Sequence, residues 1–115
     1  MGRYSYLVLT QARPGREAEF GRWYDERHLD VVARIPGVVA TRRFKVVHKK
    51  VTNLDAPQWC SLAIYDIEAD DPRTVLNSIY AVSGTAAMPL SEALNRDGLV
   101  EVIGEPVERA QADDE

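Results

Sequence analysis

The residues best suited to chemistry lie in the segment RWYDERHLDVV, residues 22–32, where His28 follows Tyr24 by four positions. A spacing of four places two side chains one turn apart on the same face of an α-helix. An imidazole with a pKa near neutrality can both accept and donate a proton, so His28 is the candidate general acid or base. Tyr24 could donate a hydrogen bond to a substrate or to His28. Asp25, toward the flank of the helix, could orient the imidazole.

The side chain of His28 is predicted to point toward the protein core. Aromatic and aliphatic residues recur at steps of three and four through this segment, which is the spacing of one helical face. The members of this face are Phe20, Tyr24, His28, Val31 and Ile35. Two interpretations of the histidine stay open. It is either a structural residue satisfied by a tyrosine hydroxyl, a carbonyl oxygen or Asp25, or a pocket residue that moves a proton or orients a ligand.

Aromatic and basic side chains from other parts of the chain are candidates for binding a substrate. They are Trp23, Arg42, Trp59, Tyr65 and Tyr80. Trp59 and Tyr65 share one face of a predicted strand, and Tyr80 lies at the edge of a predicted helix stripe. Together they could line an apolar cavity with a few polar groups. Arg42 could bind a carboxylate or a phenolate through its guanidinium group. For each aromatic residue the alternative is ordinary core packing.

The elements that must position these residues follow from periodicity and turn signals. Strands are predicted at residues 4–12, 38–49, 59–67 and 98–108. A helix is predicted from Gly15 to about Ile35, where Pro36 stops it. A second helix follows Asp71, which can cap it, with Pro72 in the first helical position.

The resulting β-α-β-β-α-β order predicts an α+β, ferredoxin-like fold, with a four-stranded antiparallel sheet and two helices on one face. The segment PLSEALN, residues 89–95, could add one helical turn. Neither face of the predicted strands is clearly polar, although a sheet with one face in water should alternate apolar and polar residues. Because the helices cover only one face, a second copy of the chain is the simplest cover for the other, and we predict a homodimer.

Composition restricts the class of protein. A chain of 115 residues with 45% hydrophobic and 28% charged residues fits one globular domain, predicted to span residues 1–108 before a disordered polar tail, residues 109–115. A net charge of −4 argues against nucleic acid or a membrane surface as partner. A single cysteine favours a reducing compartment, and we expect the cytoplasm. Two distant histidines and one cysteine show no metal-ligand spacing, so no metal site is predicted.

Residues 19–44, EFGRWYDERHLDVVARIPGVVATRRF, resemble the dimeric α+β barrel superfamily and, within it, the EthD-like branch. Members show a tryptophan–tyrosine–acid run, then histidine–leucine–proline, then a proline–glycine turn that leads into a strand containing arginine. The matching residues here are Trp23, Tyr24, Asp25, His28, Leu29, Pro36, Gly37, Arg42 and Arg43. One departure is Asp30, which stands where relatives have proline.

The resemblance implies two ferredoxin-like subunits whose sheets pack into a barrel, each with a pocket between its sheet and its helices. It does not imply one reaction, because members include cofactor-free monooxygenases, cyclases, decarboxylases, dehydratases and haem-degrading proteins. We expect an enzyme without a cofactor, an EthD-like lyase or cyclase or a cofactor-free monooxygenase. His28 would act as general acid or base in the decarboxylation, dehydration or cyclisation of an aromatic or polyketide-like substrate. The alternative is a non-catalytic dimeric module that binds a small ligand in the same pocket.

Overall fold

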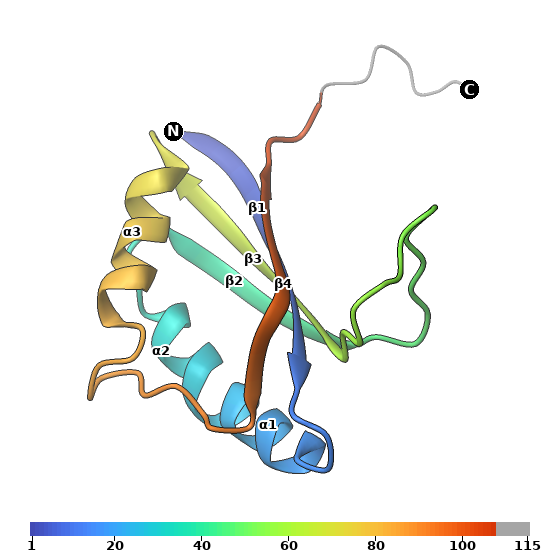
Figure 1. The fold of residues 1–115 in the computed structure, drawn as a ribbon. Helices are drawn as coiled ribbons and strands as arrows, with labels where there is room; N and C mark the ends of the chain where they lie inside the picture. The colour runs from blue at the N-terminus through green and yellow to red at the C-terminus, as the bar shows by residue number, and fades with distance from the viewer. Residues whose placement is uncertain (108–115) are drawn as a thin grey trace.

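A computed structural model describes residues 1–107, so the predicted tail, residues 109–115, lies outside the described residues. Four strands form one antiparallel sheet in the spatial order β2-β3-β1-β4. Their bounds are β1 (Gly2–Ala12), β2 (Val38–Lys45), β3 (Ser61–Ala69) and β4 (Leu94–Gly104). The helices of the described chain all lie on one side of this sheet (Figure 1). The predicted ferredoxin-like fold is therefore confirmed.

The helices are α1 (Glu17–Trp23), the π-helical turn η1 (Tyr24–His28), α2 (Leu29–Ala33) and α3 (Pro72–Val82). The first three follow one another without a break. At the end of η1 the N–H of Leu29 donates to the carbonyl of Tyr24, five residues earlier, so this turn is wider than an α-helical one. The extra width moves the buried face by one position. As a result α2 buries Val32 completely, whereas Val31, predicted for this face, is only partly buried.

The connection between β2 and β3 is longer than predicted. β2 ends at Lys45 and β3 begins at Ser61, so residues 46–60 leave the sheet and extend beyond it (Figure 1). One backbone hydrogen bond, from the N–H of Val46 to the carbonyl of Cys60, holds the base of this connection. The outer parts of the two predicted strands therefore belong to the connection.

The last strand begins earlier than predicted. The sequence predicts a helical turn at residues 89–95, but this is wrong, because Leu94 and Asn95 already pair with β1. The pairing of β1 with β4 then shifts, so that residues 96–99 of β4 stand opposite the single residue Thr10 of β1. Such a bulge re-aims the side chains of the longer strand.

The core lies on the sheet face that the helices cover. Its strand residues are Tyr6, Val8 and Thr10 of β1, which stand opposite Tyr65, Ala63 and Ser61 of β3. The rings of Tyr6 and Tyr65 stack with their centroids 5.4 Å apart. Phe20 and Tyr24 pack over this face from the helices. The centre of the core is therefore aromatic and brings several phenol hydroxyls into the interior.

The opposite face of the sheet is apolar apart from two ion pairs, Arg3–Glu68 and Arg42–Asp66, and the described part of the chain places no helix on it (Figure 1). The pairing register puts Leu7, Leu9, Phe44, Leu62, Ile64, Val100 and Val102 on this face. Phe44 and Val102 remain 43% and 52% exposed. A contiguous apolar surface of this kind is typical of a contact with another molecule.

Gly37 joins α2 to β2 at a point where a side chain would be strained. Its φ is 98°, and a Cβ atom there would lie 2.5 Å from Cγ2 of Val75 in α3. We predict that Gly37→Ala lowers the free energy of unfolding by about 2 kcal/mol, since it adds backbone strain and an overlap of atoms. Urea denaturation followed by circular dichroism measures this change.

The matched control for this substitution is Gly104→Ala, because a Cβ atom at Gly104 meets no other atom within 4 Å. We expect it to change the free energy of unfolding by no more than about 0.5 kcal/mol. Equal urea midpoints for Gly37→Ala and the wild-type protein would contradict the prediction.

Candidate functional site

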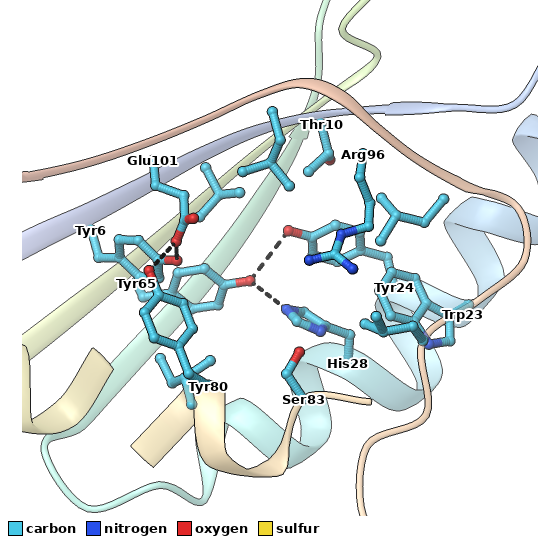
Figure 2. A pocket seen from close by; sticks show the side chains of 15 residues that line it. Tyr6, Thr10, Trp23, Tyr24, His28, Tyr65, Tyr80, Ser83, Arg96 and Glu101 are labelled. Carbon is cyan, nitrogen blue, oxygen red and sulfur yellow. Dashed lines mark hydrogen bonds between the residues drawn. The ribbon is translucent and has the colours of Figure 1, made fainter. Parts of the chain in front are cut away.

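A cavity of about 370 Å³ lies between the helix-covered face of the sheet and the helices. Side chains from all these layers converge on it, as Figure 2 shows. Its volume is near the lower end of the range for small-molecule sites, about 300 to 1,000 Å³. The wall combines aromatic and aliphatic side chains with a few polar ones, which is typical of such sites.

The hydroxyl of Tyr65 contacts two other polar side chains in the wall of this cavity. It lies 3.1 Å from Nε2 of His28 and 3.3 Å from the hydroxyl of Tyr24 (Figure 2). Tyr65 comes from β3, whereas Tyr24 and His28 are the first and last residues of η1. The wide π-helical turn thus presents both its end residues to one hydroxyl on the sheet. Turns of this kind are frequent at functional sites.

Aromatic rings hold the imidazole of His28 in place. The ring of Tyr24 meets it edge-on with centroids 4.8 Å apart, and the ring of Trp23 lies 5.1 Å away. Trp23 is itself fixed, because its Nε1 donates to the carbonyl of Pro89 at 2.8 Å. The imidazole is therefore packed between rings on one side and hydrogen-bonded to Tyr65 on the other.

His28 is neutral at physiological pH. Burial disfavours its charged form and lowers the pKa of the imidazole from 6.5 to about 4. Burial also raises the pKa of Tyr65 and of Tyr24, so both phenols keep their protons. Depending on its tautomer, Nε2 of the neutral imidazole either accepts a hydrogen bond from the Tyr65 hydroxyl or donates one to it. Nδ1 makes no hydrogen bond within residues 1–107.

A carboxylate lies in the cavity wall at some distance from the imidazole. Oε1 of Glu101, in β4, accepts a hydrogen bond from the hydroxyl of Tyr80 at 2.8 Å and another from the hydroxyl of Tyr6. Burial, reinforced by this contact with Glu101, raises the pKa of Tyr6. Both phenols therefore act as donors that fix the carboxylate at the edge of the cavity.

Arg96 reaches the cavity from the bulge in β4. Two hydrogen bonds hold the backbone of this bulge. Nε1 of Trp59 donates to the carbonyl of Gly98 at 2.7 Å, and Nε2 of Gln11 donates to the carbonyl of Asp97 at 2.5 Å. Within the described chain the guanidinium of Arg96 forms neither an ion pair nor a hydrogen bond. Its side chain is exposed and contributes a positive charge to the wall of the cavity.

The structure brings five of the eight predicted site residues to this cavity. They are Trp23, Tyr24, His28, Tyr65 and Tyr80. Their contacts differ from the expected ones in one respect. The hydroxyl of Tyr24 bonds to Tyr65, which stands between Tyr24 and the imidazole.

Asp25, Arg42 and Trp59 do not line the cavity. Asp25 forms an ion pair with Arg43, with oxygen–nitrogen distances of 2.6 and 2.9 Å, because its position on the helix flank faces β2. Arg42 pairs in register with Ile64 and therefore projects from the opposite face of the sheet. Trp59 precedes β3 and holds the β4 bulge instead.

Sequence reasoning missed several lining residues, of which Glu101 and Arg96 carry charge. The signal for Glu101 was present, since it is the one acid in the apolar run GLVEVIG, residues 98–104. Arg96 gave no comparable signal, because its position depends on the bulge.

Residues 1–107 contain no group of three or more histidine, cysteine, aspartate or glutamate side chains that could hold a metal ion. No helix in that range is long and apolar enough to cross a lipid bilayer.

Together the fold and the cavity define a ferredoxin-like α+β domain with a small-molecule-sized pocket between its sheet and its helices. No family model and no curated protein matches the sequence. Solved structures do match the fold. An EthD-like protein from Ralstonia eutropha JMP134 has 16% sequence identity and a TM-score of 0.62, over 96% of this chain and 97% of that chain.

Two further structures extend the comparison. A dimeric ferredoxin-like protein of unknown function from Jannaschia sp. CCS1 has 15% identity and a TM-score of 0.61, over 91% of this chain and 100% of that one. A candidate monooxygenase from Shewanella loihica PV-4 has 10% identity and a TM-score of 0.61, over 94% and 97%. At these identities the similarity establishes the fold. It is the fold of the EthD-like proteins that residues 19–44 resemble.

Proposed function

We propose that this protein is a cofactor-independent enzyme that moves protons on a small aromatic or polyketide-like substrate. His28 acts as the general acid or base through the hydroxyl of Tyr65. The 3.1 Å contact between Nε2 and that hydroxyl, in the wall of the cavity, carries the proposal. The EthD-like and candidate monooxygenase neighbours support a small-molecule role for the fold. Decarboxylation, dehydration and cyclisation all include a proton transfer of this kind.

The contacts define how the proton would move. As the oxygen of Tyr65 takes a proton from a carbon next to a ligand carbonyl, its own proton passes to Nε2 of His28. The C–H bond breaks, its electron pair shifts to the carbonyl oxygen, and an enolate forms. The hydroxyl of Tyr24, 3.3 Å from that of Tyr65, would donate to the Tyr65 oxygen and stabilise the negative charge that develops on it during the transfer. General acid–base catalysis of this type contributes about a hundredfold or more to rate.

Other residues of the cavity have supporting roles in this proposal. Trp23 fixes the imidazole by ring contact, and Tyr80 lines the opposite wall. We assign no contact with substrate to Asp25, Arg42 or Trp59, since none of them lines the cavity.

We infer that the working form is a homodimer. The uncovered apolar face of the sheet supports this, because a second copy packed sheet to sheet would remove it from water. The matching structure from Jannaschia sp. CCS1 is that of a dimeric ferredoxin-like protein. In this arrangement the cavity stays on the helix side of each subunit, away from the interface.

One observation favours a binding module as the second candidate function. The low pKa of His28, about 4, means that the imidazolium needed after proton uptake is costly in the empty cavity. In a binding module, His28 and Tyr65 would serve only as hydrogen-bonding groups in the wall.

Exchange of the C1 protons of 2-tetralone for deuterium tests proton transfer without knowledge of the natural substrate. The C1 carbon of this ketone is both benzylic and next to the carbonyl, so the ketone enolises, and proton NMR in D₂O follows the loss of the C1 signal. We expect the wild-type protein to accelerate exchange above buffer. His28→Gln and Tyr65→Phe should each lower that acceleration about a hundredfold, because each breaks the relay.

The control for this measurement is His48→Gln, which replaces the chain's other histidine at an exposed position. It should exchange protons at the wild-type rate. Wild-type exchange that matches buffer, or equal rates in wild type and His28→Gln, would remove the catalytic role and leave the binding module.

A further inference from the structure

Two exposed, charged side chains of β4 contribute to the wall of the cavity. Glu101 lies in the regular part of the strand and Arg96 in the bulge. Neither forms an ion pair within residues 1–107. Figure 2 shows them on opposite sides of the cavity, with the hydroxyl of Tyr65 between them. The cavity therefore has a negative side and a positive side.

On the negative side, only one oxygen of the Glu101 carboxylate accepts hydrogen bonds in the described chain. The hydroxyls of Tyr6 and Tyr80 both donate to Oε1 of Glu101. Oε2 makes no hydrogen bond in the described chain. An ionised carboxylate only accepts hydrogen bonds, so Oε2 is complementary to a hydroxyl or an amino group of a ligand.

On the positive side, Arg96 offers a planar guanidinium with several N–H donors. Such a group matches the two oxygens of a carboxylate or the oxygen of an enolate. The bonds from Trp59 and Gln11 to the backbone of the bulge fix the point from which this side chain starts. These two residues position Arg96 and make no contact with the cavity themselves.

We propose that the ligand is a hydroxyaryl carboxylate or its enolisable equivalent, with a hydroxyl at one end and an anionic oxygen group at the other. This inference rests on the proposed function, since it describes the ligand of the same cavity. The hydroxyl donates to Oε2 of Glu101, the anionic group binds Arg96, and the apolar ring system spans the space beside Tyr65. A cavity of about 370 Å³ limits the ring system to a small one.

Four compounds and three variants test this proposal by isothermal titration calorimetry. The compounds are 6-hydroxy-2-naphthoate, 6-methoxy-2-naphthoate, 2-naphthoate and 2-naphthol. We expect wild-type protein to bind the hydroxy acid about tenfold more tightly than the methoxy acid, which cannot donate, and than 2-naphthoate. Glu101→Gln should abolish that preference. Its amide oxygen can keep the hydrogen bonds from Tyr6 and Tyr80, while its amide NH₂ group cannot accept a hydrogen bond from the ligand.

Arg96→Gln tests the positive side of the cavity independently of Glu101. It should weaken binding of all three carboxylates about tenfold and leave binding of 2-naphthol unchanged, because 2-naphthol has no carboxylate. Arg34→Gln is the matched control, since Arg34 is exposed and lies outside the cavity. It should bind every compound as the wild-type protein does.

The calorimetry results test the proposed ligand class and do not test the proposed function. Equal affinity for the hydroxy and methoxy acids overturns it, as does an unchanged affinity of Arg96→Gln for the carboxylates. Failure of all four compounds to bind overturns it as well. None of these results affects exchange of 2-tetralone, which carries neither a hydroxyl nor a carboxylate. If the calorimetry contradicts the proposed ligand class while exchange of 2-tetralone still depends on His28, the proposed function is unaffected.

Discussion

Lowering the pH from 7 to 4 is expected to destabilise the wild-type protein by about 3 kcal/mol more than the His28→Gln variant. The imidazole of His28 has a pKa of about 4 in the folded protein, against an ordinary value of 6.5. Between these values the unfolded chain takes up a proton that the folded chain does not. Stability is therefore fully present above about pH 6.5 and is lost as the pH falls toward 4. Each pKa unit corresponds to about 1.4 kcal/mol, which gives the expected size.

Urea denaturation at pH 7 and pH 4, at one fixed protein concentration, measures this difference. Hydrogen bonds from the side chain of Arg43 and from the N–H of Arg73 lower the pKa values of Asp25 and Asp71. These carboxylates also lose stabilising contacts in acid, but they do so in both proteins. The difference between the two proteins thus isolates His28. His48→Gln should keep the wild-type pH dependence, and an identical pH dependence in His28→Gln would show that the imidazole is not buried in its neutral form.

The order of elements could be predicted from the sequence because each signal is local. Turn residues such as Pro36 and Gly37 and the capping pair Asp71 and Pro72 mark where helices and strands change, and they act over a few neighbouring residues. Because these signals are local, they do not give the exact ends of the strands. Nothing near residues 89–95 reveals that this segment pairs with β1, since that pairing joins residues about eighty positions apart along the chain.

Sequence periodicity predicts the buried face of the helix correctly only up to the π-helical turn. A constant 3.6-residue repeat places Tyr24 and His28 on the sheet side, and the structure agrees. The π-helical turn then adds one residue to the repeat, so that Val32 takes the position predicted for Val31. Both ends of the turn contact Tyr65 on the sheet, and the periodicity of one helix does not contain that information.

Which charged residues face the cavity depends on how the strands pair. Arg42 and Arg43 are adjacent in sequence and project from opposite faces of the sheet, so a shift of one position decides which of them faces the helices. Likewise Arg96 reaches the cavity only because four residues of β4 stand opposite one residue of β1. Strand register is fixed by the whole sheet, and for this reason the sequence predicts Arg42 rather than Arg96 at the cavity.

Val102→Lys is expected to weaken homodimer association by about a thousandfold or more. Val102 pairs with Leu7 and lies on the apolar face of the sheet that carries no helix in the described chain. In a two-fold dimer packed through this face, one substitution places two like charges in the same interface. Burial of an unpaired charge costs several kcal/mol, and about 4 kcal/mol corresponds to a thousandfold change in Kd. Sedimentation equilibrium at micromolar concentrations measures this Kd.

This substitution separates assembly from folding. Val102 is 52% exposed in the single chain, so a lysine there can reach water in the monomer and circular dichroism should show an unchanged fold. Ala81→Lys, at an exposed position on α3, adds the same charge on the helix side and should leave the Kd unchanged. A wild-type protein that is monomeric at micromolar concentration would refute the dimer. An unchanged Kd for Val102→Lys would place the contact elsewhere, and the apolar face would then need a different partner.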